Sequence, residues 1–371
     1  MPQPRIPILD LAAEWAEVGP AVEAAVLRVL RSGQYVLGPE TAAFEAELAA
    51  LVGTRFAVGV GSGTEALVLA LRAVGVEAGD EVVTSPFTYF ATVEAILWAG
   101  ARPIFADIER DGFLLDPERL AAALGPRTRA IVPVHLFGRC AEMAGIRALA
   151  DERGVAVVED AAQAIGAERD GRAAGAWGRA GCFSFYPSKN LGAAGDAGAV
   201  TTDDEELAAR LRLLRSHGSG RARDRHELVG TTSRLDSLQA AVLRAKLPHL
   251  GRWSAARAGH AAYYDEALRG LPGLVLPGAG PGERHVWNQY TVRCRNAEGV
   301  RQALSQANVE WRHYYPLPAY RQPALGKERL PEGTCPEAER ACTEAISLPI
   351  YPALPPAARD RIAEAVRAAL A

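Results

Sequence analysis

The sequence has few of the residues that fix disulfides or mark a metal or redox site. Its five cysteines are odd in number and scattered, and none of them falls at CxxC spacing. This pattern is typical of reduced thiols in a cytoplasmic protein, so we expect most of them to be buried and predict no metal site. They are Cys140, Cys182, Cys294, Cys335 and Cys342.

Long apolar runs and a dominant charge are also missing. The candidate stretch, residues 66–76, is interrupted by Arg72 and is too short to cross a membrane. The formal charge is 41 − 44 = −3, which is too balanced for a nucleic-acid-binding surface. The first residues, MPQPRIPILDL, contain no basic segment followed by an apolar one, so we expect no secretory signal. We therefore predict a cytoplasmic protein with no membrane or nucleic-acid partner.

The sequence contains enough apolar residues to form more than one hydrophobic core. It has 371 residues, of which 49% are hydrophobic and 23% charged, and this composition is typical of a globular protein. A chain of this length exceeds what one hydrophobic core normally organises. We predict a large domain over residues 1–250 and a smaller C-terminal domain over residues 251–371.

Strand-like and helix-like runs alternate along the chain, as in an α/β protein. The predicted strands are the short runs 56–60, 81–84, 102–106, 130–134 and 155–158, and the segment 287–293, which alternates like a strand. The predicted helices have apolar residues at helical spacing or clear start and stop signals. Two of them end at a glycine: 22–30 stops at Gly33 and 39–51 stops at Gly53. Further helices are predicted at 143–151, 237–247 and 355–371. For the others only one end is predicted: one follows 61–67, one ends near 99, one starts at 116–117 and one ends near 268.

The sequence has only three lysines, and one of them has unusual neighbours. Lys189 lies between an apolar, aromatic run and a tail with three glycines, whereas Lys246 is on a predicted helix and Lys327 is in a polar loop. A loop lysine is ordinarily solvated. Apolar surroundings would instead disfavour its charge and make it nucleophilic enough to form a Schiff base with an aldehyde. We interpret Lys189 as a candidate pyridoxal phosphate lysine.

Other segments are compatible with the same cofactor. GSGTEAL, residues 61–67, opens a predicted helix whose free N–H groups could bind a phosphate, although a tight turn with a Thr cap is equally consistent. Asp160 and Gln163 come at the end of a buried strand, where open α/β sheets bind ligands. A carboxylate there can keep a pyridine nitrogen protonated; alternatively, Glu159 and Asp160 cap a following helix. The aromatic pair in SPFTYFAT, residues 85–92, either stacks on a planar cofactor or belongs to the core.

Together these segments resemble the DegT/DnrJ/EryC1/StrS family of fold-type I pyridoxal phosphate aminotransferases, which act on nucleotide-linked keto-sugars. The motifs that carry the resemblance are GQYVLGPE, GSGTEAL, PFTYFAT, VVEDAAQAIGA, SFYPSKNLG, GDAGAV, SRLDSLQAAVL, YYPLP and SLPIYP. They span nearly the whole chain. The resemblance implies a large domain with a mostly parallel, seven-stranded sheet sandwiched by helices, and a smaller C-terminal α+β domain.

The resemblance also implies roles for individual residues. Lys189 would form the Schiff base and then move a proton as general base and acid. Asp160 would pair with the pyridine nitrogen, and Gln163 would lie near the phenolic oxygen of the ring. Tyr89 would stack on the ring, while Phe90 would point elsewhere. The implied phosphate contacts are the backbone of Gly63 and Thr64, the hydroxyl of Ser184 and, from the other subunit of a homodimer, the segment around Thr232.

Two positions depart from the family pattern. Thr232 stands where the family usually has Asn before SRLD, which weakens one implied phosphate contact. Residues 318–320 read Pro-Ala-Tyr where many members read PLH, and this difference affects the implied sugar contacts. The candidate substrate contacts are Arg234, His313, Tyr314 and Tyr315. For the aromatic cluster the alternative is structural packing, and for the arginine it is a buried interface ion pair.

The reaction implied by the resemblance is a ping-pong transfer of an amino group. L-glutamate would supply the amino group, and a UDP- or dTDP-linked keto-hexose would receive it. SRLDSLQAA and WNQYTVR are more similar to members that aminate carbon 3 than to those that aminate carbon 4. One alternative is a sugar dehydratase of the same family, in which histidine replaces the lysine, so Lys189 argues against it. Another is a pyridoxal phosphate-binding regulatory protein without turnover, which the intact Lys189, Asp160 and Ser184 disfavour.

Overall fold

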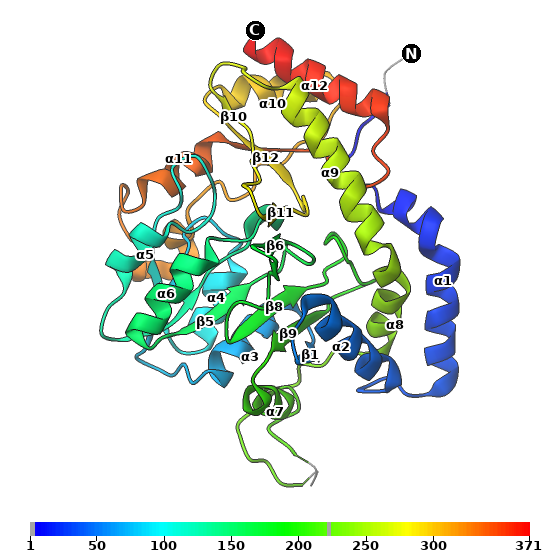
Figure 1. Ribbon diagram of the computed structural model, residues 1–371, viewed down its shortest axis with the longest axis vertical. Helices are drawn as coiled ribbons and strands as arrows, with labels where there is room; N and C mark the ends of the chain where they lie inside the picture. Colours follow the sequence, from blue (N-terminus) through cyan, green and yellow to red (C-terminus); the bar gives the residue numbers. More distant parts are fainter. Residues whose placement is uncertain (1–3, 221–223) are drawn as a thin grey trace.

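The centre of the molecule is a seven-stranded sheet with the strand order β1-β9-β8-β5-β4-β2-β3 (Figure 1). The computed structural model describes residues 4–220 and 224–371. The five strands from β8 to β3 are parallel, whereas β9 is antiparallel to both β8 and β1. The strands are β1 (Phe56–Val60), β2 (Glu81–Thr84), β3 (Arg102–Phe105), β4 (Thr128–Val132), β5 (Ala156–Asp160), β8 (Ala180–Ser184) and β9 (Gly198–Thr202). The predicted mostly parallel α/β sheet is confirmed.

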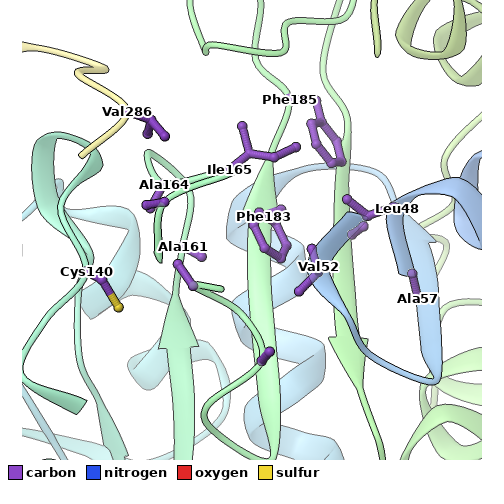
Figure 2. Close-up of a cluster of buried hydrophobic side chains, with 14 of the residues drawn as sticks. Leu48, Val52, Ala57, Cys140, Ala161, Ala164, Ile165, Phe183, Phe185 and Val286 are labelled. Atoms are coloured by element: carbon purple, nitrogen blue, oxygen red, sulfur yellow. The ribbon is translucent and has the colours of Figure 1, made fainter. Parts of the chain in front are cut away.

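Helices cover both faces of this sheet, which explains why its strands read as short continuous apolar runs. One face packs against α2 (Pro39–Val52), α5 (Pro117–Ala123), α6 (Met143–Arg153) and α8 (Ser237–Lys246). The other face packs against α3 (Gly63–Ala73), α4 (Ala91–Trp98) and α7 (Glu205–Leu214). Figure 2 shows part of the first core, in which Phe183 and Phe185 lie close to Leu48 and Val52 of α2. The predicted sandwich of helices around the sheet is therefore confirmed.

Several helix ends follow the signals in the sequence. Gly33 and Gly53 have left-handed backbone angles and end α1 (Leu11–Ser32) and α2, as predicted. The Asp116 side chain caps α5 by accepting from the N–H of Glu118. Helix α1 begins eleven residues before the predicted start at Val22, because Asp10 caps it at Leu11.

The C-terminal part of the chain gathers at one end of the molecule (Figure 1). Its antiparallel sheet consists of β10 (Leu274–Val275), β12 (Tyr290–Cys294) and β13 (Ala345–Leu348). The helices of this part are α9 (Leu250–Ala267), α10 (Ala297–Gln306), α11 (Pro336–Glu344) and α12 (Pro356–Leu370). A second small sheet joins β11 (Glu283–Arg284) to β6 (Glu168–Arg169) and β7 (Arg172–Ala173).

The two ends of the described chain meet in this C-terminal part, because Ile6 pairs with Val309 and packs in the same core. A single 3-10 turn, Leu247–His249, separates α8 from α9. The division into domains at residue 250 remains a prediction. Within residues 4–220 and 224–371, no helix combines the length and the apolar character that a membrane span needs.

Candidate active site

A cavity of about 460 Å³ lies at the carboxyl edge of the central sheet. Asp160 is the last residue of β5 and Ser184 is the last residue of the neighbouring parallel strand β8, and both line the cavity. Gly63, the first residue of α3, lines the cavity just after the end of β1. Parallel strands bring their carboxyl ends to one edge, so residues far apart in the sequence meet here.

Lys189 lies on the wall of this cavity, in the loop that follows β8. The loop is tight, because the Lys189 N–H donates to the Tyr186 carbonyl at 2.8 Å. The next residue, Asn190, anchors it by donating to the Val286 carbonyl at 2.7 Å. Burial lowers the pKa of Lys189 to about 8, although the Asp160 carboxylate partly opposes this shift. A larger share of this amine is therefore neutral and nucleophilic near neutral pH than in an exposed lysine.

Asp160 faces the same cavity and is 6% exposed. Its Oδ2 accepts from the Thr92 hydroxyl at 2.8 Å, and its Oδ1 accepts from the Ala162 N–H at 3.2 Å. Burial raises the pKa of Asp160, while these two donors and Lys189 act in the opposite direction. The site thus places a buried carboxylate and a half-buried amine on the walls of one cavity.

The alternative that Glu159 and Asp160 cap a helix is wrong. Residues 161–167 form turns rather than a helix. The Glu159 side chain points into the protein, where it accepts from His135 and from three backbone N–H groups. These N–H groups belong to Gly175, Trp177 and Gly178, each at 2.7 Å. Four donors satisfy this buried carboxylate and leave Asp160 as the carboxylate of the pair that faces the cavity.

His135 ties this buried carboxylate to the strand ends. Its Nδ1 accepts from the Ala141 N–H at 3.0 Å, so its proton is assigned to Nε2, which donates to Glu159 at 2.8 Å. The backbone N–H of His135 also donates to the Asp160 carbonyl at 3.0 Å. His135 therefore fixes the backbone on which Asp160 is mounted.

The first turn of α3 forms another wall of the cavity. Ser62 caps the helix by accepting from the Glu65 N–H at 3.2 Å, so the cap is Ser62 and not Thr64. The N–H groups of Gly63 and Thr64 have no carbonyl partner within the helix, as in any first helical turn. A Cβ on Gly63 would lie 2.5 Å from the Cβ of Ser184. Only glycine lets the helix start approach Ser184 this closely.

Aromatic side chains form the outer part of the cavity. Tyr89 lines the cavity and is 66% exposed, whereas the neighbouring Phe90 does not line it and packs against an apolar cluster. Tyr315 also lines the cavity, and its hydroxyl accepts from Gln163 Nε2 at 3.0 Å. Gln163 Oε1 in turn accepts from the Phe137 N–H at 2.6 Å. These bonds hold the C-terminal segment against the end of the central sheet.

Comparison with known proteins assigns this arrangement to a family. The family model of the DegT/DnrJ/EryC1/StrS aminotransferases matches residues 17–367. The chain belongs to this aminotransferase family.

Relatives of this aminotransferase match it over nearly its whole length. The dTDP-3-amino-3,4,6-trideoxy-alpha-D-glucose transaminase of Streptomyces venezuelae is 47% identical over 364 residues, which cover 98% of this chain and 96% of that protein. A protein of Geobacillus stearothermophilus named pleiotropic regulatory protein is 42% identical, with 94% of each chain covered. The crystal structure of S. venezuelae DesV in complex with a ketimine intermediate has a TM-score of 0.96 and 47% identity, covering 99% of this chain and 98% of that one.

The cofactor of the aminotransferase is pyridoxal phosphate, and the cavity fits it. An amine, a buried carboxylate and the start of a helix lie on three of its walls, contributed by Lys189, Asp160 and Gly63. The amine of Lys189 suits the aldehyde of the cofactor, the carboxylate of Asp160 suits its ring nitrogen, and the helix start at Gly63 suits its phosphate. Among residues 4–220 and 224–371, no three His, Cys, Asp or Glu side chains are arranged to hold a metal ion.

Three of the predicted site residues of the aminotransferase lie outside this cavity within one chain. Thr232 is exposed, and its hydroxyl meets His217 Nε2 at 2.6 Å. Arg234, two residues further on, is half-buried. His313 borders a separate surface pocket, where its Nε2 meets the Cys342 carbonyl at 2.6 Å. Their predicted cofactor and substrate contacts are not formed by the single chain.

Residues 318–320, which differ from the PLH of many family members, have a structural role in this protein. Tyr320 is fully buried, its hydroxyl donates to Glu339, and its ring packs edge-on against Phe105. It belongs to the core and not to the cavity.

Further residues that line the cavity were not predicted from the sequence: Thr88, Thr92, Ser188, Asp196 and Gln289. The two threonines stand four residues apart in PFTYFAT, just before and within a predicted helix, and this spacing could have placed them on one face.

Proposed function

We propose that this aminotransferase transfers an amino group from L-glutamate to a nucleotide-linked keto-hexose, at a keto group on carbon 3, and acts as a cytoplasmic homodimer. The observation that carries the proposal is the joint placement of Lys189 and Asp160 on one cavity at the carboxyl edge of the sheet. The choice of carbon 3 is supported by the name of the S. venezuelae relative, a dTDP-3-amino sugar transaminase.

Different residues of the cavity would have different roles in the reaction. Pyridoxal phosphate, when bound, supplies a ring that withdraws electrons from the carbon next to the transferred nitrogen. Lys189 holds the cofactor and, once released, moves the proton between carbon atoms as general base and acid. A pKa of about 8 suits both directions of this transfer near neutral pH. Asp160 would place a negative charge near the ring nitrogen, and this charge would help the nitrogen to keep its proton.

The remaining cofactor contacts follow from the cavity walls. The Gly63 and Thr64 N–H groups and the Ser184 hydroxyl would bind the phosphate, because they line the cavity at the positive end of the α3 dipole. Gln163 would face the phenolic oxygen and Tyr89 would cover the ring, since both side chains line the cavity.

The sugar occupies the aromatic part of the cavity, against Tyr314 and Tyr315. The Tyr315 hydroxyl accepts from Gln163, and its hydrogen has no acceptor elsewhere in the described chain, so it can donate to a sugar oxygen. The backbone of Tyr315 has φ +58, an unusual value for a tyrosine. Contacts of its ring with Phe87 and Phe137 hold this conformation, which is typical of strain at functional sites.

The homodimer is supported by an apolar surface next to the segment that contains Thr232. Large apolar side chains are exposed on the second half of α1 and in the turn after it: Leu27, Leu30, Tyr35, Val36 and Leu37. Exposed apolar patches of this kind mark interaction surfaces. Val36 also pairs with Asp236, which places the patch beside residues 232–236. A second copy that covers the patch would bring Thr232, and with it Arg234, to the cavity of its partner.

Mixed dimers test this arrangement. Lys189→Ala and Thr232→Trp subunits are each inactive in the proposed scheme. A mixed dimer places both defects in one composite site and leaves the other site intact, so activity should return. No recovery after confirmed subunit exchange would mean that Thr232 does not serve the partner's site.

A second candidate is a pyridoxal phosphate-binding regulatory protein without turnover, because the relative from G. stearothermophilus carries a regulatory name. The sugar dehydratase is disfavoured by the lysine at position 189. Mixing the holoenzyme with L-glutamate alone separates the candidates. We expect the cofactor absorption to change to that of pyridoxamine phosphate and to return on addition of a UDP- or dTDP-linked 3-keto sugar. A spectrum that stays unchanged in glutamate would favour the regulatory protein.

A further inference from the structure

A chain of buried hydroxyl groups runs from Thr88, just before α4, through Thr92 in α4 to Asp160. The Thr88 hydroxyl lies 2.9 Å from that of Thr92, and the Thr92 hydroxyl lies 2.8 Å from Asp160 Oδ2. Thr88 is 5% exposed and Thr92 is 1% exposed. The chain is thus enclosed on the protein side of the cavity, where a missing hydrogen bond is costly.

The number of protons determines the direction of these bonds. Thr92 has one hydroxyl proton and two acceptors, Asp160 Oδ2 at 2.8 Å and the Tyr89 carbonyl at 3.2 Å. An ionised carboxylate is the stronger acceptor, so the proton points to Asp160 and Thr88 donates to Thr92. If Asp160 were protonated, it would donate to Thr92, which would then turn to the Tyr89 carbonyl. The direction of the chain therefore depends on the ionisation of Asp160.

Among the described groups around Asp160, Thr92 is the side chain that donates a hydrogen bond to its carboxylate. The second carboxylate oxygen of Asp160 has one backbone donor, Ala162, at 3.2 Å. The charged or titratable side chains that act on Asp160 are Lys189, His135, Cys182 and Tyr315. Lys189 is committed to the cofactor in the proposed function, and His135 donates to Glu159. Thr92 is the side chain within the described chain that donates a hydrogen bond directly to the Asp160 carboxylate.

We propose that Thr92, supported by Thr88, is a positioning residue of the reaction, whose hydroxyl keeps the Asp160 carboxylate ionised and turned toward the nitrogen of the cofactor ring. The proposal rests on the proposed function, and specifically on the role of Asp160. Thr92 also touches the carbonyl of Tyr89, so it links the residue that pairs with the ring nitrogen to the residue that covers the ring.

The test compares holoenzymes that carry Thr92→Val and Thr92→Ser. Valine keeps the shape and removes the hydroxyl, whereas serine keeps the hydroxyl and removes the methyl group. Thr84→Val is a matched control, because Thr84 is also buried and its hydroxyl donates to the Val132 carbonyl at 2.8 Å. The readouts are the rate constant of the L-glutamate half-reaction as a function of pH and the dissociation constant of pyridoxal phosphate.

We expect Thr92→Val to slow the half-reaction about 10- to 100-fold, as for loss of a hydrogen bond to a charged group. The acidic limb of its pH profile should move to higher pH, because the loss of a donor raises the pKa of Asp160. Its dissociation constant for pyridoxal phosphate should rise about tenfold. Thr92→Ser and Thr84→Val should stay within about threefold of the wild type, without a shift of the limb. Thr88→Val should shift the limb in the same direction by less, and it replaces Thr92→Val if that variant does not fold.

Asp160→Asn distinguishes the failure of this proposal from the failure of the proposed function. If Asp160→Asn slows the half-reaction severely while Thr92→Val behaves like the wild type, the positioning role of Thr92 is wrong and the function stands. If Thr92→Ser is as slow as Thr92→Val, the effect comes from packing and the proposal is also wrong. If Asp160→Asn itself has little effect, the proposed function fails with it. The proposal would be supported if Thr92→Val alone shifts the acidic limb of the pH profile, and if adding Thr92→Val to Asp160→Asn produces no such shift.

Discussion

The two halves of the cavity are built in different ways. The half assigned to the cofactor comes from the ends of adjacent strands, with Asp160 at the end of β5, Ser184 at the end of β8 and Gly63 just after β1. The half assigned to the substrate comes from Tyr314 and Tyr315, which belong to the C-terminal part and reach the cavity by packing. The first half is fixed by the sheet, and the second depends on how another part of the chain lies against it.

This difference implies that changes in the two halves affect the reaction differently. A change in the cofactor half should impair both half-reactions, because both use the same ring. A change in the substrate half should impair only the half-reaction with the sugar.

The largest of these effects is expected for Asp160→Asn. The neutral amide cannot stabilise a protonated ring nitrogen, so both half-reactions should slow by more than tenfold, or about 1.4 kcal/mol of barrier, while the cofactor stays bound. Stopped-flow absorbance with L-glutamate and then with the sugar measures both steps. Asp116→Asn is the control, since asparagine also caps α5 and should leave the rates unchanged. A loss smaller than tenfold would remove Asp160 from the proposed role.

The next effect is expected for Gly63→Ala, which should weaken both the stability of the protein and its binding of the cofactor. The added Cβ would lie 2.5 Å from the Cβ of Ser184, so the start of α3 and the strand end must separate. We expect a loss of about 1–3 kcal/mol in the free energy of unfolding and about tenfold weaker binding of pyridoxal phosphate. Gly251→Ala, also in a helix but with no atom within 4 Å of the new Cβ, should be neutral or stabilising by up to about 1 kcal/mol. Equal destabilisation of the two variants would contradict the close-approach argument.

The smallest effect is expected for Tyr314→Phe in the substrate half, where the Tyr314 side chain hydrogen-bonds to Gln289 on the cavity wall and its hydroxyl would also face the sugar. The loss of one hydroxyl should raise the KM for the sugar about three- to tenfold, as for one neutral hydrogen bond, and leave the glutamate half-reaction within about twofold. Steady-state kinetics with the sugar and stopped-flow with glutamate separate the two. If the glutamate step slowed as much as the sugar step, the two halves of the cavity would not be separable.

The same contrast explains what could be predicted from the sequence. The strands and helices with clear apolar runs or caps were found, as were the glycine stops at Gly33 and Gly53. The strands β8 and β9, on either side of the Lys189 loop, were not predicted, nor were α7, α10, α11 and β13. The order of the strands and the antiparallel direction of β9 depend on pairing between distant segments, which no local pattern contains. The cofactor half was predictable because its residues stand at strand ends and helix starts.

The contacts that were missed are those that depend on distant packing. Glu159 and Asp160 are adjacent and chemically alike, and which of them faces the cavity depends on donors supplied by residues 135 and 175–178. Thr92 contacts Asp160 across 68 positions of sequence, so its partner could not be read locally. Tyr320 lies in a motif that suggests substrate contact, but its partner Glu339 on α11 holds it in the core.

The central claim is that Lys189 is the residue that bonds to the cofactor, and the uptake of pyridoxal phosphate by the cofactor-free protein tests it most directly. The bond can be trapped with borohydride at several pH values between about 6 and 10, and the labelled peptide identified by mass. The neutral amine is the nucleophile, and its share rises about tenfold per pH unit below its pKa. With the pKa lowered to about 8, the rate should rise up to about pH 8 and then level off, with the label on Lys189 and none in Lys189→Ala. A rate that keeps rising through pH 10, or a label on Lys246 or Lys327, would contradict the account.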